Sequence, residues 1–393
     1  MWPDRLRLRF SNTLLTYGIG AVLCLEMAIA ADGTGELASL GQALFFDTNL
    51  SANRTQSCAT CHDPERAFTD GRGNDVGGAV SLGDDGVSLG DRNSPSAAYA
   101  FLIPDFHRDD NGEFIGGYFH DGRATTMADQ AGQPFVNPIE MGLPDKKAVV
   151  ERVIENPSYV AAFKRLYGSD VLGDIDLAFR AITESLVAFQ STPMFAAFDS
   201  RYDRFLRGEY QLTEAEELGR ELFFSPLLNC SSCHLLNTLD TSSHETFSNH
   251  QYHNIGVPAN TRVRQKNGLA KDHRDLGLLE NPSVHDPGQA GKFRVPGLRN
   301  VAVTGPYMHN GVFRDLSTAI LFYGKFQLGD RQSQTNPETG KPWGVAEVPE
   351  TVNLHLLEEG QPVNRDRAAA LEAFLKTLTD QRYESLLAQE PVH

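Results

Sequence analysis

Two short stretches of the chain carry residue types whose spacing could do chemistry. Each reads Cys-x-x-Cys-His, and the residues concerned are Cys58, Cys61 and His62, then Cys230, Cys233 and His234. This spacing is the attachment signature of c-type haem, in which both thiols bond the porphyrin and the histidine ligates iron. A single structural zinc held by both cysteine pairs is the alternative. The histidine after each pair favours two covalent haem c groups.

The sixth position on each iron separates an electron carrier from an enzyme, because an open face admits peroxide. When the two halves are aligned without gaps from His120 and His309, Pro134 pairs with Tyr323. Proline offers no donor atom, so we expect an open, high-spin haem 1 and a six-coordinate haem 2 closed by His234 and Tyr323. A phenolate favours ferric and higher-valent iron. A packed core tyrosine is the other interpretation of Tyr323.

An open haem that uses peroxide needs a group that moves a proton between the two peroxide oxygens. Glu140, within Asn-Pro-Ile-Glu-Met, is the candidate for this role. Gln130 is expected to donate a hydrogen bond from one helix segment earlier. A surface glutamate is the alternative interpretation of Glu140.

The elements that must position these groups are helical. Apolar residues recur at helical spacing near 37–45, 149–154 and 371–375, and alternating strand patterns are scarce. Three landmarks also recur in the same order. They are Leu-Gly-x-x-Leu-Phe-Phe at 40–46 and 218–224, Arg-Asn-Ser-Pro at 92–95 against Phe-Arg-Val-Pro at 293–296, and Tyr-Phe-His-Asp-Gly at 118–122 against Tyr-Met-His-Asn-Gly at 307–311. We therefore expect an all-α protein of two cytochrome c-like domains, 31–200 and 201–393, each with one haem and long loops.

Composition and the N-terminal residues indicate where the protein is located and which partners are disfavoured. The chain has 393 residues and a formal net charge of −16, which disfavours nucleic acid as a partner. Residues 1–30 combine a basic start, an apolar run and Ala-Ile-Ala, the pattern of a cleaved Sec-type signal peptide, with a retained anchor as the alternative. We expect a periplasmic protein that is not an integral membrane protein after the signal is removed.

Two acidic loops leave an alternative open. The Gly- and Asp-rich stretch 70–91 and the stretch 109–113 are interpreted as solvated loops, with calcium binding as the alternative. Hard cations prefer clustered carboxylate and carbonyl oxygens, but neither stretch has the full spacing of an EF-hand.

Taken together, the motifs resemble the bacterial di-haem cytochrome c peroxidase and MauG superfamily over essentially the whole mature chain. The matching residues are the doubled LGxxLFF–CxxCH, Arg92-Asn93-Ser94-Pro95, His120-Asp121-Gly122-Arg123, Asn137-Pro138-x-Glu140-Met141, and Arg294-x-Pro296-x-Leu298-Arg299-Asn300-Val301-Ala302. The resemblance implies one Ca²⁺ between the haems. Its ligands would be the side chain of Asn93 and the backbone carbonyls of Thr304 and Pro306.

Within the superfamily, Tyr323 and the absence of histidine between Asp63 and Phe106 are similar to the MauG–MbnH branch. That branch places Glu140, Gln130 and Pro134 in the distal pocket. It implies an enzyme that uses hydrogen peroxide, through a high-valent state shared by both irons, to oxidise an aromatic residue of a periplasmic partner. MbnH-like conversion of Trp to kynurenine is the expected reaction.

Two alternatives and two departures accompany this expectation. A cytochrome c peroxidase fed with electrons by a small cytochrome or copper protein is the main alternative, and a pure electron carrier is a third. His120 stands where MauG has a tryptophan between the haems, and could be a bridge or a core histidine bonded to a propionate. Leu228 stands where MauG has a surface tryptophan, so the quinoprotein precursor on which MauG acts is not the expected partner.

Overall fold

The computed structural model describes residues 34–236, 245–270, 272–327 and 334–388. The signal peptide expected at 1–30 lies outside these residues. A helix over 34–45 opens the described chain. The further α-helices are α2 (Cys58–Cys61), α3 (Met127–Val136), α4 (Lys146–Ile154), α5 (Pro157–Tyr167), α6 (Ile175–Gln190), α7 (Arg201–Leu206), α8 (Glu214–Phe224), α9 (Thr261–Arg264), α10 (Leu316–Phe322), α11 (Leu354–Glu358) and α12 (Arg365–Lys376). The strands are β1 (His107–Arg108), β2 (Phe114–Ile115), β3 (Tyr252–His253), β4 (Phe293–Arg294), β5 (Thr335–Asn336) and β6 (Lys341–Pro342).

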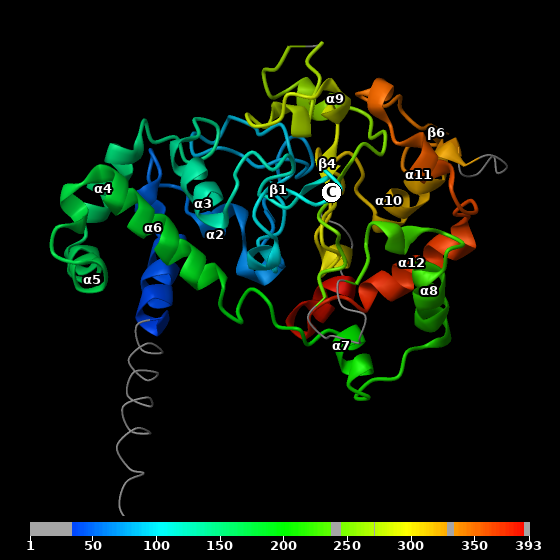
Figure 1. Ribbon diagram of the computed structural model, residues 1–393, viewed down its shortest axis with the longest axis horizontal. Coiled ribbons are helices and arrows are strands. Elements are labelled where there is room, and N and C mark those ends of the chain that lie inside the picture. The colour runs from blue at the N-terminus through cyan, green and yellow to red at the C-terminus, as the bar shows by residue number, and fades with distance from the viewer. Residues whose placement is uncertain (1–33, 237–244, 271, 328–333, 389–393) are drawn as a thin grey trace, which may run out of the picture.

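The first group of helices packs around the helix over 34–45 and α6, at the left of Figure 1. A Cβ atom added to Gly41 would lie 1.8 Å from the carbonyl oxygen of Ser185 in α6, so the two helices approach as closely as backbones allow. Their apolar faces belong to a buried cluster that includes Leu44, Phe45 and Ile182. Burying such faces is what holds short helices in place.

The second group repeats this arrangement at the right of the molecule, where α8 lies against α12 (Figure 1). A Cβ atom on Gly219 would lie 1.9 Å from the carbonyl oxygen of Ala370 in α12. Phe223 and Phe374 pack in the cluster beneath this crossing. The repeated Leu-Gly-x-x-Leu-Phe-Phe therefore encodes one helix crossing used twice.

The third repeat also has the same structure in both halves. An isolated antiparallel bridge joins Tyr118 to Ala124, and its counterpart joins Tyr307 to Phe313. The helices that follow, α3 and α10, begin at equivalent positions of the repeat. The two positions that the ungapped alignment pairs differ locally, since Pro134 lies inside α3 while Tyr323 follows the last residue of α10.

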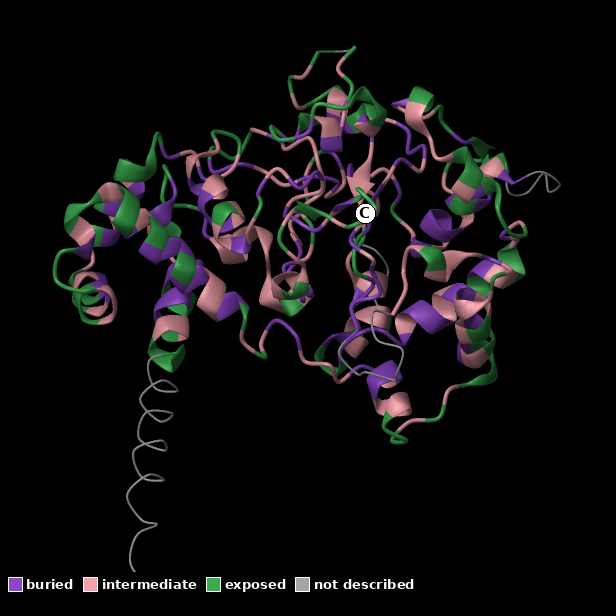
Figure 2. Ribbon diagram, in the orientation of Figure 1, coloured by how far each residue is buried: buried purple, intermediate pink, exposed green. Residues whose placement is uncertain are grey.

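The middle of the molecule consists of loops and short ribbons in which buried segments continue from one group of helices to the other (Figure 2). The strands of the described chain pair antiparallel as β1–β2, β3–β4 and β5–β6. In β3–β4, Tyr252 is in register with Arg294. A bridge between Ile115 and Gln251 ties the first ribbon to the second.

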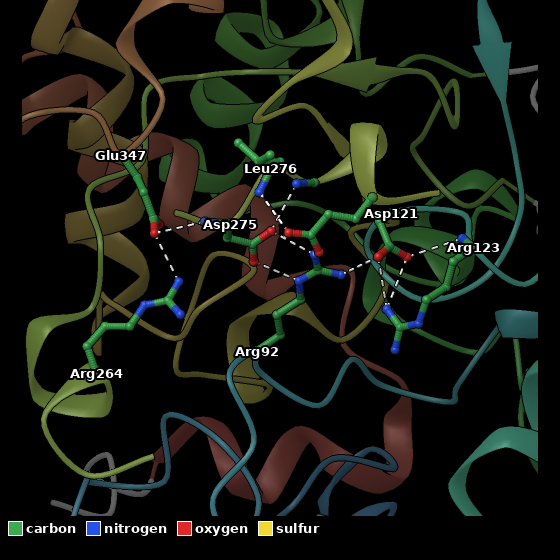
Figure 3. Close-up of polar contacts among 9 residues, drawn as sticks. Arg92, Asp121, Arg123, Arg264, Asp275, Leu276 and Glu347 are labelled. Carbon is green, nitrogen blue, oxygen red and sulfur yellow. Dashed lines mark hydrogen bonds and ion pairs between the residues drawn. The ribbon is translucent and has the colours of Figure 1, made fainter. Parts of the chain in front are cut away.

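A buried ion cluster joins the two halves through this middle region (Figure 3). The Arg92 guanidinium binds Asp121 at 2.6 Å and Asp275 at 2.7 Å, and all three side chains are at most 8% exposed. Glu280 adds a third carboxylate at 2.9 Å. Removing one partner of such a cluster leaves an uncompensated buried charge.

The helix-rich architecture expected from the sequence is confirmed, with the three ribbons as an addition to the all-α expectation. The ribbons are two residues per strand, too short to leave an alternating pattern in the sequence. In the part of the chain that the structure describes, no helix has the length and apolarity that a membrane crossing requires.

Candidate active site

The first Cys-x-x-Cys-His motif forms α2, a single helical turn that presents both thiols and the histidine together. The backbone N–H of His62 donates to the carbonyl oxygen of Cys58 at 2.9 Å, which keeps the histidine on the end of this turn. The Nδ1 of His62 lies 3.1 Å from the carbonyl oxygen of Phe68. With Nδ1 engaged, Nε2 is the nitrogen left to bind a metal.

The second motif repeats the arrangement. The N–H of His234 donates to the carbonyl oxygen of Cys230 at 3.1 Å, and Nδ1 of His234 lies 3.0 Å from the carbonyl oxygen of Phe247. Phe68 and Phe247 both adopt the left-handed conformation, with φ of 57° and 59°, and both are fully buried. Such a conformation costs about 1–3 kcal/mol for a non-glycine residue and persists where its surroundings enforce it.

Burial keeps the ionisable groups of both motifs neutral. It raises the pKa of Cys58 to about 12 and that of Cys61 to about 11, so both thiols are protonated at neutral pH. Burial also raises the pKa of Cys230 to about 12. Burial lowers the pKa of His234 to about 4, which leaves a neutral imidazole, the form that binds iron.

His234 and Tyr323 line one cavity of about 390 Å³, together with Cys230 and Cys233. The wall of this cavity is predominantly apolar, with Leu316 and Leu371 among its residues, as an interior site for a large planar group requires.

Tyr323 is 38% exposed, yet its surroundings raise its pKa as those of a buried group do. The two facts agree because its accessible surface is the wall of the cavity rather than the outside of the protein. The raised pKa follows from burial, with the thiols of Cys233 and Cys230 adding to it. Such a phenol stays protonated at neutral pH unless a cation at its oxygen favours the phenolate.

On the other side of the molecule, α3 carries Gln130 and Pro134 one turn apart, so both face the same way. The backbone N–H of Met141 donates to the carbonyl oxygen of Pro134 at 3.1 Å, and that of Leu143 to Phe135 at 2.9 Å. The segment after α3 thus folds back along the helix end. This turn brings Met141, the neighbour of Glu140 in the chain, against Pro134.

Glu140 is held and tuned by its neighbours. The side-chain amide of Asn137 donates to Oε1 of Glu140 at 2.9 Å. Burial raises the pKa of Glu140, while the positive charge of Arg123 opposes the shift. The charge of Glu140 in turn adds to the raised pKa values of Cys58 and Cys61, which places this carboxyl close to the first motif. A carboxyl whose pKa moves toward neutrality is suited to accept and return a proton.

Asp84 anchors the segment that carries Glu140. Its side chain is 7% exposed and accepts hydrogen bonds from the hydroxyls of Ser51 and Thr55 at 2.7 and 2.6 Å. Its backbone N–H donates to the carbonyl oxygen of Glu140 at 2.7 Å. The solvated-loop interpretation of 70–91 is therefore wrong for Asp84, because hydroxyl and backbone donors hold this carboxylate inside the protein.

The second acidic stretch closes a ribbon. Asp109 accepts hydrogen bonds from the backbone N–H groups of Asn111 and Glu113, both at 2.9 Å, at the turn between β1 and β2. Among the described residues, no three His, Cys, Asp or Glu side chains gather as a metal site would require. The predicted calcium ligands are of another kind, amide and carbonyl oxygens.

Those predicted ligands, Asn93, Thr304 and Pro306, all lie on the wall of the 390 Å³ cavity. The Nδ2 of Asn93 donates to the carbonyl oxygen of Ala79 at 3.1 Å, so this contact uses the amide nitrogen and not the amide oxygen. Amide and carbonyl oxygens are ligands that Ca²⁺ accepts. The donor set therefore fits the ion.

His120 lies beside this group. Its Nε2 is 2.9 Å from the carbonyl oxygen of Asn93, and burial together with the charges of Arg92 and Arg294 lowers its pKa to about 4. His120 is thus a neutral imidazole that fixes the backbone of Asn93. Whether His120 is a bridge or a core histidine bonded to a propionate stays a prediction.

Sequence reasoning missed several residues of the site. Phe68 and Phe247 follow their histidines at different intervals, 6 and 13 residues, so the repeat does not align them. Asp84 is one of many acidic residues in its loop. The buried ion cluster left one sign in the sequence, Arg92 in Arg-Asn-Ser-Pro. Its carboxylate partners are far away in the sequence.

Comparisons with known proteins agree with this geometry. The family model for di-haem cytochrome c peroxidase matches residues 35–211. The methylamine utilization protein MauG of Paracoccus denitrificans is 52% identical over 93% of this chain and 96% of its own length. The diheme peroxidase BthA of Burkholderia thailandensis superimposes with a TM-score of 0.81 at 31% identity, covering 91% of this chain and 89% of that one.

A second solved structure, described as a MauG-like protein associated with microbial copper homeostasis, has a TM-score of 0.64 at 32% identity, with 91% and 92% of the two chains covered. The agreement extends over nearly the whole chain and includes both attachment motifs. The chain belongs to the di-haem cytochrome c peroxidase and MauG family, whose members are oxidoreductases that use peroxide.

Proposed function

We propose that this protein is a MauG-like enzyme that uses hydrogen peroxide to oxidise an aromatic residue, a tryptophan, on a periplasmic partner protein, with kynurenine as the MbnH-like product. The observation that carries the proposal is the asymmetry of the repeat. Tyr323 lies on the wall of the cavity that contains His234, while the equivalent residue of the first half is Pro134.

The haem groups, bound at the two motifs, supply the oxidising equivalents that peroxide delivers. Within the first half, Glu140 accepts a proton from one peroxide oxygen and returns it to the other, and Gln130 orients the peroxide from the same helix face. Pro134, which stands where the second half has Tyr323, has no side-chain atom that could ligate the haem iron of the first half. In the second half, His234 and Tyr323 would both hold the haem, and Tyr323 would exclude peroxide from it.

The proposal includes several finer assignments. The protein would consist of cytochrome c-like domains 31–200 and 201–393, with haem 1 open and haem 2 six-coordinate. One Ca²⁺ would bind to Asn93, Thr304 and Pro306 between them. Export to the periplasm through residues 1–30 accords with haem attachment outside the cytoplasm.

The ligand assignment is tested by EPR of the resting protein beside Tyr323→Phe. We expect one high-spin and one low-spin ferric signal in the wild type, with the low-spin signal alone altered in the variant. Tyr307→Phe is the matched control, because Tyr307 lines the same cavity but donates its hydroxyl to the carbonyl oxygen of Val301 at 3.0 Å. A low-spin signal that is identical in wild type and Tyr323→Phe would remove Tyr323 as ligand.

The reaction is tested by mass spectrometry of candidate periplasmic partners after incubation with the enzyme and peroxide. Oxidation confined to one tryptophan supports the proposal. The structural likeness to a diheme peroxidase favours the second candidate, reduction of peroxide with electrons from a small cytochrome or copper protein. Turnover of about 1–1000 per second with such a donor, without oxidation of any partner residue, would establish that function instead.

A further inference from the structure

Arg294 is a half-buried cation on the wall of the cavity, with no matching anion among the described residues. It ends β4, where it is in register with Tyr252 of β3, and its backbone N–H donates to the carbonyl oxygen of His120 at 2.9 Å. The side chain lies on the wall of the cavity that also contains His234 and Tyr323. Its position is therefore fixed from both sides by backbone pairing.

The polar surroundings of the guanidinium do not balance its charge. Arg294 forms no ion pair within the described chain, and its Nε is buried without a hydrogen bond. The guanidinium has a hydrogen-bond contact with Nδ1 of His250, which lies 3.4 Å from Nη1. That histidine is neutral, since burial and the charge of Arg294 lower its pKa to about 3.

Other buried arginines of the molecule show what is missing. Arg92 pairs with Asp121 and Asp275, and Arg264 pairs with Glu347 at 2.9 Å (Figure 3). Arg299 pairs with Asp203 at 2.6 Å. An isolated charge in the interior costs several kcal/mol unless it is paired. Arg294 therefore requires an anion that the polypeptide does not supply.

Two further nitrogens mark the same wall as a place for an acceptor. Nε2 of His253 and Nε2 of His309 are both buried without a hydrogen-bond partner, and both residues line the cavity. Burial lowers the pKa of His309 to about 3, so it is a neutral donor or acceptor. Arg294 therefore shares this wall with two other polar groups that the described protein atoms leave without a hydrogen-bond partner.

The cavity itself limits what that anion can be. Its other residues include Cys230, Cys233 and His234, the attachment residues of one haem. Haem c carries two propionate carboxylates on the edge opposite its thioether bonds. A guanidinium binds a carboxylate through two parallel hydrogen bonds, the geometry that a fixed arginine favours.

We propose that Arg294 binds a propionate of the haem attached at Cys230 and Cys233 and sets the reduction potential of that haem. The inference rests on haem binding by the second motif, and not on the identity of the oxidised partner. Arg294 is a positioning residue, since it touches the carboxylate edge of the haem and not the reacting atoms.

The first test is a crystal structure of the wild-type holoprotein. We expect a propionate oxygen of the second haem within about 4 Å of the Arg294 guanidinium, the usual limit of an ion pair. A guanidinium that instead contacts chloride, water or a propionate of the first haem would overturn the assignment. This measurement needs no variant, so it does not depend on the folding of a mutant.

The second test compares the reduction potentials of both haems in Arg294→Gln, Arg294→Lys and the wild type. Mass spectrometry first confirms two covalent haems in each protein, which separates this question from a failure of haem binding. Removing the positive charge favours the ferric form, so one potential should fall in Arg294→Gln. We expect a shift of about tenfold in the ferric-to-ferrous equilibrium, which is 59 mV for one electron.

The lysine variant keeps the charge and should shift that equilibrium by less than half as much. Arg201→Gln is the control, because Arg201 is also partly buried but pairs with Glu216 at 2.6 Å in the second helix group. It should leave both potentials unchanged. Equal potentials in the wild type and Arg294→Gln, or equal shifts of both haems, would contradict the proposal.

Discussion

The backbone N–H of Asp84 donates to the carbonyl oxygen of Glu140 at 2.7 Å, while the Asp84 carboxylate is bound by hydroxyls that precede the first haem motif. One residue thus ties the proposed proton-transfer group to the segment that presents the haem ligands. A loop that would be interpreted as solvated from its composition acts as a support for the site.

Replacing Asp84 with alanine should impair the reaction with peroxide. Loss of the carboxylate frees Ser51 and Thr55 and loosens the segment that holds Glu140, and a displacement of about 1 Å can lower a rate by about 100-fold. Stopped-flow measurement of the bimolecular rate with peroxide would detect a decrease of about 10- to 100-fold. Asp85→Ala is the control, since that exposed carboxylate caps only its own turn through Val87 and Ser88. Equal rates for the two variants would disprove the supporting role.

Glu140→Gln should remove the proton acceptor itself. We expect the rate with peroxide to fall by about 10²–10⁴-fold, the usual contribution of general acid–base catalysis. Because burial raises the pKa of Glu140, the wild-type rate should rise with pH through a value above the ordinary pKa of a glutamate. The variant should lose this rise. A variant that keeps both the rate and the pH profile would show that another group takes the proton.

Arg92→Gln should destabilise the protein at neutral pH by about 3–5 kcal/mol, because it leaves Asp275 buried without its arginine, while Asp121 keeps only Arg123 at 3.0 Å. Burial alone would raise the pKa of Asp275, but the hydrogen bond and charge of Arg92 hold it well below its ordinary value. The same balance lowers the pKa of Asp121.

Depressed carboxyl pKa values stabilise the folded state above the ordinary value of about 4, and this contribution is lost as pH falls through the folded-state values. The difference between wild type and Arg92→Gln should therefore shrink in acid. Denaturant unfolding of the holoproteins at several pH values measures it. Arg54→Gln, which breaks an exposed pair with Glu155, should behave as wild type. A difference that is constant from neutral to acidic pH would contradict the linkage.

Gly219→Ala should disrupt the crossing of α8 and α12, since the added Cβ would lie 1.9 Å from a carbonyl oxygen. Forcing the helices apart should cost about 1–3 kcal/mol or more. Gly41→Ala should do the same in the first half. Gly35→Ala is a control in the same helix as Gly41, because its Cβ would have no neighbour within 4 Å, and it should leave stability unchanged or increase it. Thermal unfolding of the three holoproteins would separate these outcomes.

The sequence predicted features that depend on residues close together in the chain. It did not predict those that depend on residues far apart. Both attachment motifs and the repeated glycine-containing helix are local patterns, so they were visible without a structure. The positions of the Phe68 and Phe247 carbonyls depend on left-handed backbone conformations, which a phenylalanine in the sequence does not predict. The pairing of Arg92 with Asp275 spans 183 residues of chain, and no pattern in one sequence connects two such positions.

Residues near the end of the described chain form hydrogen bonds with residues of the first half. The hydroxyl of Tyr99 donates to Asp380 at 2.5 Å, and that of Tyr383 donates to the carbonyl oxygen of Pro64, just after the first haem motif, at 2.8 Å. The earliest haem-binding segment to be synthesised therefore obtains its last stabilising contacts from some of the latest residues. A premature stop ahead of position 380 would therefore destabilise the first half of the protein, although that half had been translated in full.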